Sequence, residues 1–280
     1  MTNPRLEQIA KRQMGPNISL ESPKPPRVLI GENYLLEKEY QFLKELAGQT
    51  GDSAEDAFCN ENGGRTFKLE GGRITRLEFH YKGVRHIPES INNLDALREL
   101  IMMTGEISVL PKTFFQLKQL ELLRLDCNNI YTIPEEIGGL TQLKQLYLNF
   151  TKLTTLPDGF GKLKRLENLQ LNTNLLEEIP DVIGELAQLV QLYIPGNRIT
   201  GIPPSMWQLR NLHVLDISSN PITRIPKGIQ ELESLKALYI HRTLIETLPR
   251  ELALLPELEI IGAKLGIKVP KELTKKMVYY

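Results

Sequence analysis

Cysteine is scarce in this sequence, with only Cys59 and Cys127 among 280 residues. Two cysteines cannot build the disulfide framework that stabilises many small extracellular domains. The N-terminal residues contain no apolar core of a signal peptide, and no run of 18 apolar residues occurs anywhere in the chain. We therefore expect a cytoplasmic protein that relies on neither disulfides nor a membrane.

Net charge is also absent, because 34 basic and 34 acidic residues cancel. Nucleic-acid-binding proteins need an excess of Lys and Arg to neutralise phosphates, and membrane-surface proteins need a polybasic patch. The four histidines, His80, His86, His213 and His241, show no metal-ligand spacing with Cys or carboxylates. The sequence therefore favours no nucleic acid, membrane or metal as a partner. It also shows no catalytic set, so we expect neither enzyme activity nor a cofactor.

What the sequence does contain is a repeat of 23 residues that keeps its register through eight copies without insertion. Such a fixed period indicates stacked units of one supersecondary structure. One leucine starts each copy, namely Leu97, Leu120, Leu143, Leu166, Leu189, Leu212, Leu235 and Leu258. A proline that follows Ile or Leu keeps the same interval, at Pro88, Pro111, Pro134, Pro157, Pro180, Pro203, Pro226 and Pro249.

The columns together read LxxLxLxxNxLxxIPxxIxxLxx over about residues 74–270, and this pattern resembles the leucine-rich-repeat family. The resemblance implies an α/β solenoid, a curved horseshoe with a parallel sheet on the concave face and short helical or 3-10 turns on the convex face. Leucines should point inward, and each stabilises the fold by about 1.5–3 kcal/mol when fully buried. At the ninth position, Asn is expected to satisfy backbone groups where the chain leaves the strand, at Asn128, Asn174, Asn197 and Asn220.

We divide the chain into four parts. Residues 1–30 contain five prolines and no periodicity, which predicts a disordered arm. Residues 31–73 predict an N-terminal cap, with an amphipathic helix over 32–47 and then a hairpin that leads into the first repeat. Residues 74–257 hold eight repeats, and residues 258–280 hold a degenerate ninth repeat and a short amphipathic C-terminal cap.

The concave face is the predicted binding surface, because the third, fifth and seventh residues of each repeat should point into solvent there. The fifth position carries tyrosine on alternate strands, about 10 Å apart. Tyrosine and arginine dominate protein interfaces, although strands also favour tyrosine without any binding role. The predicted partner-binding residues are Arg124, Asp126, Tyr147, Asn149, Gln170, Asn172, Tyr193, Asp216, Tyr239 and His241. Phe115 and Trp207, on the convex side, are expected to pack against the next turn instead.

Three functions stay open at this stage. The favoured one is an adaptor or scaffold that binds a protein partner as a monomer. Resemblance to cytosolic Ras-binding scaffolds makes a small GTPase or signalling enzyme a candidate partner, and the N-terminal helix and hairpin also resemble prokaryotic members of the family. The second is a glycan or host-ligand recognition module that uses Tyr147, Gln170 and Tyr193. The third is the substrate-recruiting arm of an enzyme complex, such as a ubiquitin ligase or a GTPase or kinase assembly.

Overall fold

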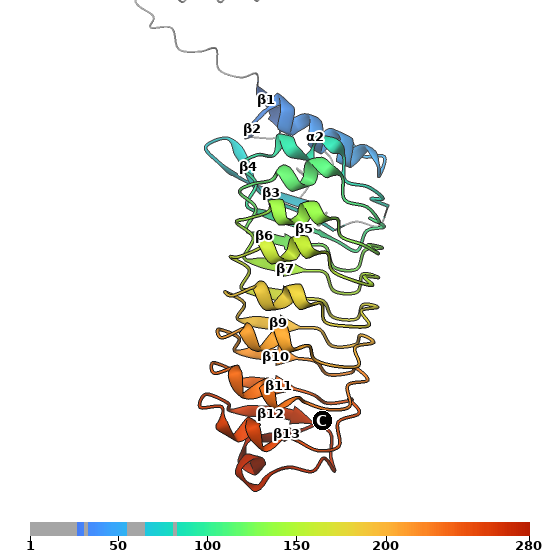
Figure 1. The fold of residues 1–280 in the computed structure, drawn as a ribbon. Helices are drawn as coiled ribbons and strands as arrows, with labels where there is room; N and C mark the ends of the chain where they lie inside the picture. The colour runs from blue at the N-terminus through green and yellow to red at the C-terminus, as the bar shows by residue number, and fades with distance from the viewer. Residues whose placement is uncertain (1–26, 31–32, 55–64, 81–82) are drawn as a thin grey trace, which may run out of the picture.

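The computed structural model describes residues 27–30, 33–54, 65–80 and 83–280, and Figure 1 shows them as a solenoid of stacked turns. Most of the predicted disordered arm lies outside these residues, as does Cys59. Within the described part of the chain, one sheet of 11 strands runs in sequence order from β3 to β13. No described helix has the length and apolar character needed to cross a bilayer.

The N-terminal cap starts with a two-stranded antiparallel sheet, β1 (Arg27–Ile30) and β2 (Asn33–Leu36), and continues into helix α2 (Glu37–Gly48). The prediction of a helix from residue 32 is therefore wrong for residues 33–36, and residues 27–30 form a strand instead of disordered chain. The strand-favouring run at Val28 to Ile30 pairs with β2 and thereby satisfies the backbone of both segments. Helix α2 buries Phe42, Leu43, Leu46 and Ala47 against the first turns of the solenoid.

The predicted hairpin is present, as antiparallel strands β3 (Arg65–Glu70) and β4 (Arg73–His80) joined at Gly71 and Gly72. Strand β4 then starts a parallel stack in which each strand pairs with its equivalent 23 residues later. The remaining strands are β5 (Glu99–Met103), β6 (Leu122–Arg124), β7 (Gln145–Tyr147), β8 (Asn168–Gln170), β9 (Gln191–Tyr193), β10 (Val214–Asp216), β11 (Ala237–Tyr239), β12 (Ile260–Ala263) and β13 (Met277–Tyr279).

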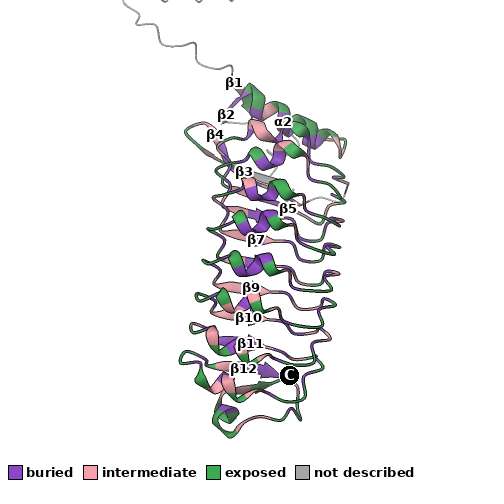
Figure 2. Cartoon of the chain, in the orientation of Figure 1, coloured by how far each residue is buried: buried purple, intermediate pink, exposed green. Residues whose placement is uncertain are grey.

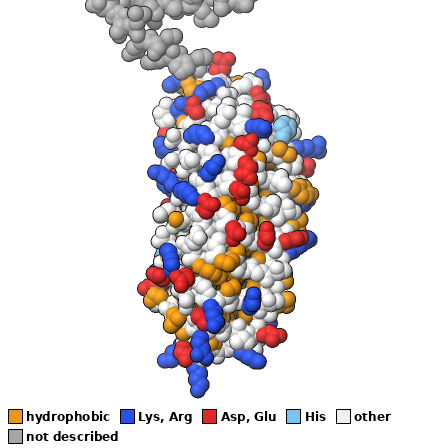
Figure 3. Space-filling view, viewed as in Figure 1, with side chains coloured by type: hydrophobic (Ala, Val, Ile, Leu, Met, Phe, Trp, Pro, Cys, Tyr) orange, Lys and Arg blue, Asp and Glu red, His pale blue; other side chains and the backbone are white. Residues whose placement is uncertain are grey.

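Short 3-10 turns return the chain on the opposite side, and each follows a proline, which fixes φ and needs no amide partner there. Figure 2 shows buried and exposed residues side by side within these turns. Acidic and basic side chains are scattered together over this side (Figure 3). The turns are η1 (Glu89–Asn93), η2 (Lys112–Gln116), η3 (Glu135–Gly139), η4 (Asp158–Lys162), η5 (Asp181–Glu185), η6 (Pro204–Gln208), η7 (Lys227–Glu231), η8 (Arg250–Leu254) and η9 (Lys271–Lys276).

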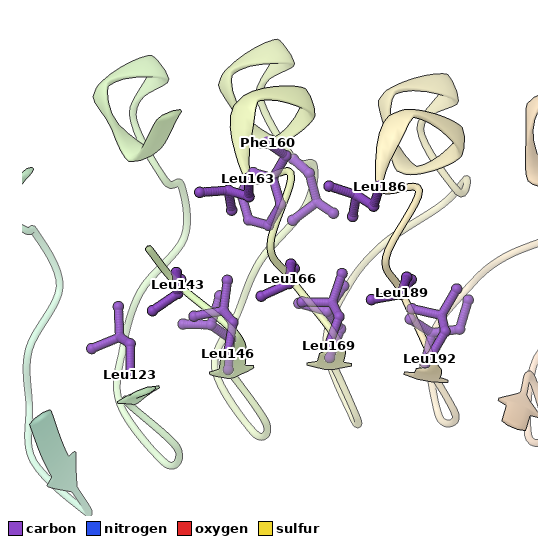
Figure 4. Packing of buried hydrophobic residues seen from close by; sticks show 14 of the residues in the cluster. Leu123, Leu143, Leu146, Phe160, Leu163, Leu166, Leu169, Leu186, Leu189 and Leu192 are labelled. Carbon is purple, nitrogen blue, oxygen red and sulfur yellow. The ribbon is translucent and has the colours of Figure 1, made fainter. Parts of the chain in front are cut away.

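The core fills the space between the sheet and the turns. Figure 4 shows Leu146 and Leu169 pointing inward from the sheet towards Phe160 and Leu163 on the helical side, all four fully buried. The predicted parallel sheet, 3-10 turns and inward leucines are thus confirmed. Neighbouring turns approach closely, because a Cβ atom on Gly159 would lie 2.2 Å from the carbonyl oxygen of Glu135.

The asparagine of the ninth position holds each repeat to its neighbour. Asn197 Nδ2 donates to the carbonyls of Leu171 and Ile194, both at 3.0 Å, and its Oδ1 accepts from the Leu176 amide at 3.1 Å. Asn128, Asn174 and Asn220 make the same three bonds in their repeats, which confirms the predicted role.

A left-handed residue precedes each of these positions, a regularity that the sequence did not reveal. Positive φ values recur every 23 residues, at Thr104, Cys127, Phe150, Thr173, Gly196, Ser219 and Arg242. Only one of them is glycine, the residue that adopts this conformation at no steric cost. Because different residue types occupy this eighth position, the consensus pattern of the repeat gives no sign of the conformation.

The C-terminal segment differs from the predicted amphipathic cap. After η9, strand β13 pairs in parallel with β12 and extends the sheet by one strand. The Tyr280 amide then donates to the carbonyl of Ala263 at 3.0 Å. This places Tyr280 close to the edge of the surface predicted to bind a partner.

Candidate functional site

The candidate site is the outer side of strands β4 to β12, formed by the third, fifth and seventh residues of each repeat, and we call it the sheet face. The strand register places the fifth residues side by side on adjacent strands. Six of the predicted residues therefore form one row, in the order Arg124, Tyr147, Gln170, Tyr193, Asp216 and Tyr239.

At the N-terminal end of the sheet face, charged side chains neutralise one another. Arg76 donates to Glu99 at 2.6 Å and to Glu78 at 2.7 Å, and His80 Nε2 lies 2.7 Å from the second oxygen of Glu78. The hydrogen bond from Arg76, with a second from His80, lowers the pKa of the Glu78 carboxyl below its ordinary value. Sequence analysis missed this cluster, although its residues occupy the third, fifth and seventh positions.

Next along the row, Arg124 is held between a carboxylate and an aromatic ring. Its Nε donates to Asp126 at 2.6 Å, and its Cζ lies 5.1 Å from the centre of the Tyr147 ring. The other oxygen of Asp126 accepts the Asn149 amide at 2.7 Å. Asp126 is only 3% exposed, which corrects the expectation that it points into solvent. Its side chain turns onto the neighbouring strand and orients Arg124.

The amides of the central strands continue this pattern. Asn149 is also buried, because its Oδ1 accepts the Asn172 amide at 2.9 Å and its Nδ2 donates to Gln170 at 3.2 Å. The equivalent oxygen of Asn172 is buried without a hydrogen-bond partner. The reason lies in the next strand, where the position that would donate is Pro195, which has no amide hydrogen. The series of hydrogen bonds from backbone amides to side-chain oxygens, at Asp126 and Asn149, therefore ends at Asn172.

Beyond this break, the row carries Asp216 between two tyrosines. Asp216 is in register with Tyr193 on one neighbouring strand and with Tyr239 on the other. One carboxylate oxygen accepts the Ser218 amide at 2.9 Å. Burial raises the pKa of the Tyr193 hydroxyl, and the nearby Tyr239 and Asp216 raise it further. The three side chains thus share one electrostatic environment.

Tyr280 closes the C-terminal end of the row. Its ring packs 4.8 Å from that of His241 and meets the Tyr239 ring edge-on at 6.5 Å. Gly262 makes room for these rings, because a Cβ atom there would lie 2.6 Å from Tyr239 and 2.9 Å from Tyr280. Of the predicted residues, Tyr239 and His241 are therefore partly covered by the chain itself.

Three aromatic side chains outside the row differ in their exposure. Phe150, at the eighth position of its repeat, is 56% exposed and adopts a left-handed conformation. Phe115 is buried and Trp207 packs on the core, where a Cβ atom on Gly228 would lie 2.2 Å from the indole nitrogen. The prediction that these two pack against the next turn is confirmed.

Two cavities lie away from the sheet face. One of about 480 Å³ opens beside Thr247, Arg250 and Lys268, and one of about 310 Å³ opens beside Pro180 and Pro203. Both lie between the proline steps of successive repeats, so they are grooves of the repeat. Across the residues that the structure describes, no three His, Cys, Asp or Glu side chains gather as a metal site would require.

Comparison with known proteins agrees with this architecture. The family model described as leucine-rich repeat region matches residues 131–218, and two leucine-rich-repeat models match residues 95–153 and 211–232. No curated protein matches the chain by sequence.

Several solved structures are similar to the chain. A leucine-rich-repeat protein from Leptospira interrogans is 29% identical with a TM-score of 0.55, over 70% of this chain and 57% of that one. The plant peptide hormone receptor RGFR1, in complex with RGF2, is 32% identical with a TM-score of 0.59, over 70% and 33%.

The ectodomain of the Arabidopsis thaliana receptor kinase GASSHO1/SCHENGEN3, in complex with CASPARIAN STRIP INTEGRITY FACTOR 2, is also similar. It is 27% identical with a TM-score of 0.51, over 72% of this chain and 28% of that one. The chain thus spans between about a quarter and three-fifths of these proteins. The repeat, the hydrogen-bonded asparagines at its ninth position and these matches together identify the chain as a leucine-rich-repeat protein.

Proposed function

We propose that the chain is an adaptor or scaffold that binds a protein partner on its sheet face and performs no catalysis of its own. The observation that carries this proposal is the row of half-buried side chains from Arg124 to Tyr239 on six adjacent strands. Rigid aromatic side chains provide contact area at little entropic cost, and they dominate protein interfaces. Solenoids routinely present such extended surfaces to partners.

The exposure of Phe150 supports the same proposal. Its left-handed backbone is shared by the equivalent residue of every neighbouring repeat, but here that residue is a large aromatic side chain that is 56% exposed. An exposed aromatic ring offers contact area to a partner. Phe150 stands at the rim beside Asn149, so a protein that docks on the sheet face also covers this ring.

The similar structures support a polypeptide ligand. Two of them are plant receptor proteins, in complex with RGF2 and with CASPARIAN STRIP INTEGRITY FACTOR 2, and the first is a peptide hormone receptor. From the family resemblance, our candidate partner remains a small GTPase or signalling enzyme. We propose that the chain binds it in the cytoplasm and as a monomer. An arm that recruits substrates to an enzyme complex is a special case of this function, and it predicts a catalytic subunit among the bound proteins.

Glycan recognition is the weaker alternative, because several of the polar groups that a sugar would use already bond to one another. The Tyr147 hydroxyl donates to Gln145, and Asn149 Nδ2 donates to Gln170. Asn168 Nδ2 likewise donates to Gln191 at 2.7 Å. A glycan array that gives hits with the wild type but not with Tyr193→Ala would reverse this preference.

The test of the proposed function is affinity capture with a matched pair of variants. The first carries Tyr147→Ala, Tyr193→Ala and Tyr239→Ala, and the control carries Tyr34→Ala and Tyr131→Ala, two exposed tyrosines outside the sheet face. Circular dichroism first establishes that all proteins are folded. We expect proteins captured by the wild type and the control to be absent from the triple variant in quantitative mass spectrometry. Equal capture by all three would contradict binding on the sheet face.

A further inference from the structure

Asp216 differs from the other carboxylates of the sheet face. Glu78 and Glu99 are paired with Arg76, and Asp126 is paired with Arg124. Asp216 instead accepts one backbone hydrogen bond, from Ser218. Among the residues that the structure describes, no Lys, Arg or His nitrogen lies within 4.0 Å of its carboxylate. A carboxylate without a cation is therefore part of the predicted binding row.

Asp216 has a tyrosine on each neighbouring strand. Tyr193 and Tyr239 stand on the two adjacent strands, each about 4.8 Å away in the direction of strand pairing. Tyr239 leans over Gly262, which is on the side away from Asp216. The neighbouring outward residues carry compact side chains, at Val214, Ala237, Pro195 and Ser218. The carboxylate therefore lies between two tyrosines, with compact side chains at the neighbouring outward positions.

The same sheet face already contains a cation bound by these groups. Arg124 is hydrogen bonded to the carboxylate of Asp126 and lies over the ring of Tyr147. A carboxylate binds a guanidinium through charge-assisted hydrogen bonds, and a tyrosine ring attracts it through the cation–π interaction. Asp216 offers the same carboxylate with tyrosines on both sides, but the cation has to come from another molecule.

We infer that Asp216, between Tyr193 and Tyr239, recognises a basic side chain of the bound polypeptide, with arginine preferred over lysine. The preference follows from the planar guanidinium, which stacks on an aromatic ring while it donates to a carboxylate. This inference rests on the proposed function, because it names the chemical group of the partner that enters the row. It also fits a surface on which the other described carboxylates are already paired.

The experiment uses a random 12-residue peptide library displayed on phage, selected in parallel against four forms of the full chain. These are the wild type, Asp216→Asn, the tyrosine triple variant, and Asp181→Asn as a control at an exposed carboxylate on turn η5. Asp216→Asn retains an oxygen that accepts the Ser218 amide, so it removes the charge and keeps the fold. We expect one position of the peptides selected by the wild type and by Asp181→Asn to be enriched in Arg and Lys. That enrichment should disappear with Asp216→Asn.

A selected peptide then gives a quantitative test. Replacing its arginine with citrulline, a neutral side chain of the same shape, should weaken binding to the wild type by about tenfold or more, as expected for a charged hydrogen bond. For Asp216→Asn, the arginine and citrulline peptides should bind equally. An equal loss in both proteins would overturn the inference.

The two proposals fail in different ways. Peptides selected by the wild type without any preference for basic residues would overturn the assignment of Asp216 and leave the binding role of the sheet face intact. If the wild type selects no peptides that the tyrosine triple variant does not also select, the proposed function and the inference are both contradicted.

Discussion

Strands β6–β8 and strands β9–β11 carry similar side chains on the sheet face, but they use them differently. In β6–β8 and the residues that follow each strand, Asp126 and Asn149 turn onto the backbone of the next strand and are buried. In β9–β11, Pro195 ends that series, and Asp216 stays partly exposed between tyrosines. The difference shows that polar residues on one surface can stabilise the fold in one region and remain available to a ligand in the next.

The largest expected effect compares the two aspartates. Asp126→Ala leaves the Asn149 amide buried without an acceptor and frees Arg124, so it should lower the free energy of unfolding by about 2–3 kcal/mol. Asp216→Ala removes one bond from a partly exposed site and should cost about 1 kcal/mol or less. Urea unfolding followed by circular dichroism measures both. Equal losses would show that the two regions do not differ in this respect.

A smaller effect is expected for the two asparagines on either side of the break. Asn149→Ala should cost about 1–2 kcal/mol, because the amide of Asn172 loses its acceptor. Asn172→Ala removes an oxygen that accepts no hydrogen bond, and it should cost about 0.5 kcal/mol or less. The same urea titrations apply, and an Asn172→Ala loss as large as that of Asn149→Ala would contradict the role given to Pro195.

The smallest effect concerns the pH dependence of the free energy of unfolding. Glu78 should lower stability on the acid side, and Tyr193 should lower it on the alkaline side. The pKa of Glu78 is lowered from 4.5 by its bond to Arg76, so its contribution is present above that pKa and is lost as the pH falls through the folded value. The pKa of Tyr193 is raised from 10.0 by burial, so its contribution is present below that pKa and is lost as the pH rises through the folded value.

Two variants separate these contributions. Glu78→Gln should flatten the acid side of the stability profile relative to the wild type, and Tyr193→Phe should flatten the alkaline side. Unfolding midpoints measured in urea at a series of pH values give the comparison. A Tyr193→Phe profile that matches the wild type above pH 10 would show that burial of the hydroxyl does not matter.

The repeat was predictable from the sequence because its rules are local. Leucine spacing, the proline before each turn and the asparagine of the ninth position each have one residue type and one physical role. The boundary of helix α2 was not predictable in the same way, since residues 33–36 have an apolar pattern that fits a helix or a strand. Pairing with residues 27–30 decides the outcome, and that is a tertiary effect.

The row of predicted site residues follows directly from the repeat, and the strand register brings the fifth positions together as expected. What each member does was not predictable. The burial of Asp126 depends on a hydrogen bond to the next strand, and the contact of Tyr280 with His241 depends on how β13 closes the sheet. Such contacts depend on three-dimensional neighbours that no spacing rule specifies.

The glycines of the helical side have a geometric consequence. Strand spacing on the sheet side is fixed by hydrogen bonding, so the bend of the solenoid depends on how far apart the turns lie behind it. At Gly159 and Gly184, a side chain would collide with a neighbouring carbonyl at 2.2 and 2.3 Å. These two glycines therefore allow the neighbouring turns behind the sheet to lie close together. A methyl group added there would push the turns apart and deepen the arc of the opposite surface, so the shape offered to a partner is set in part from behind.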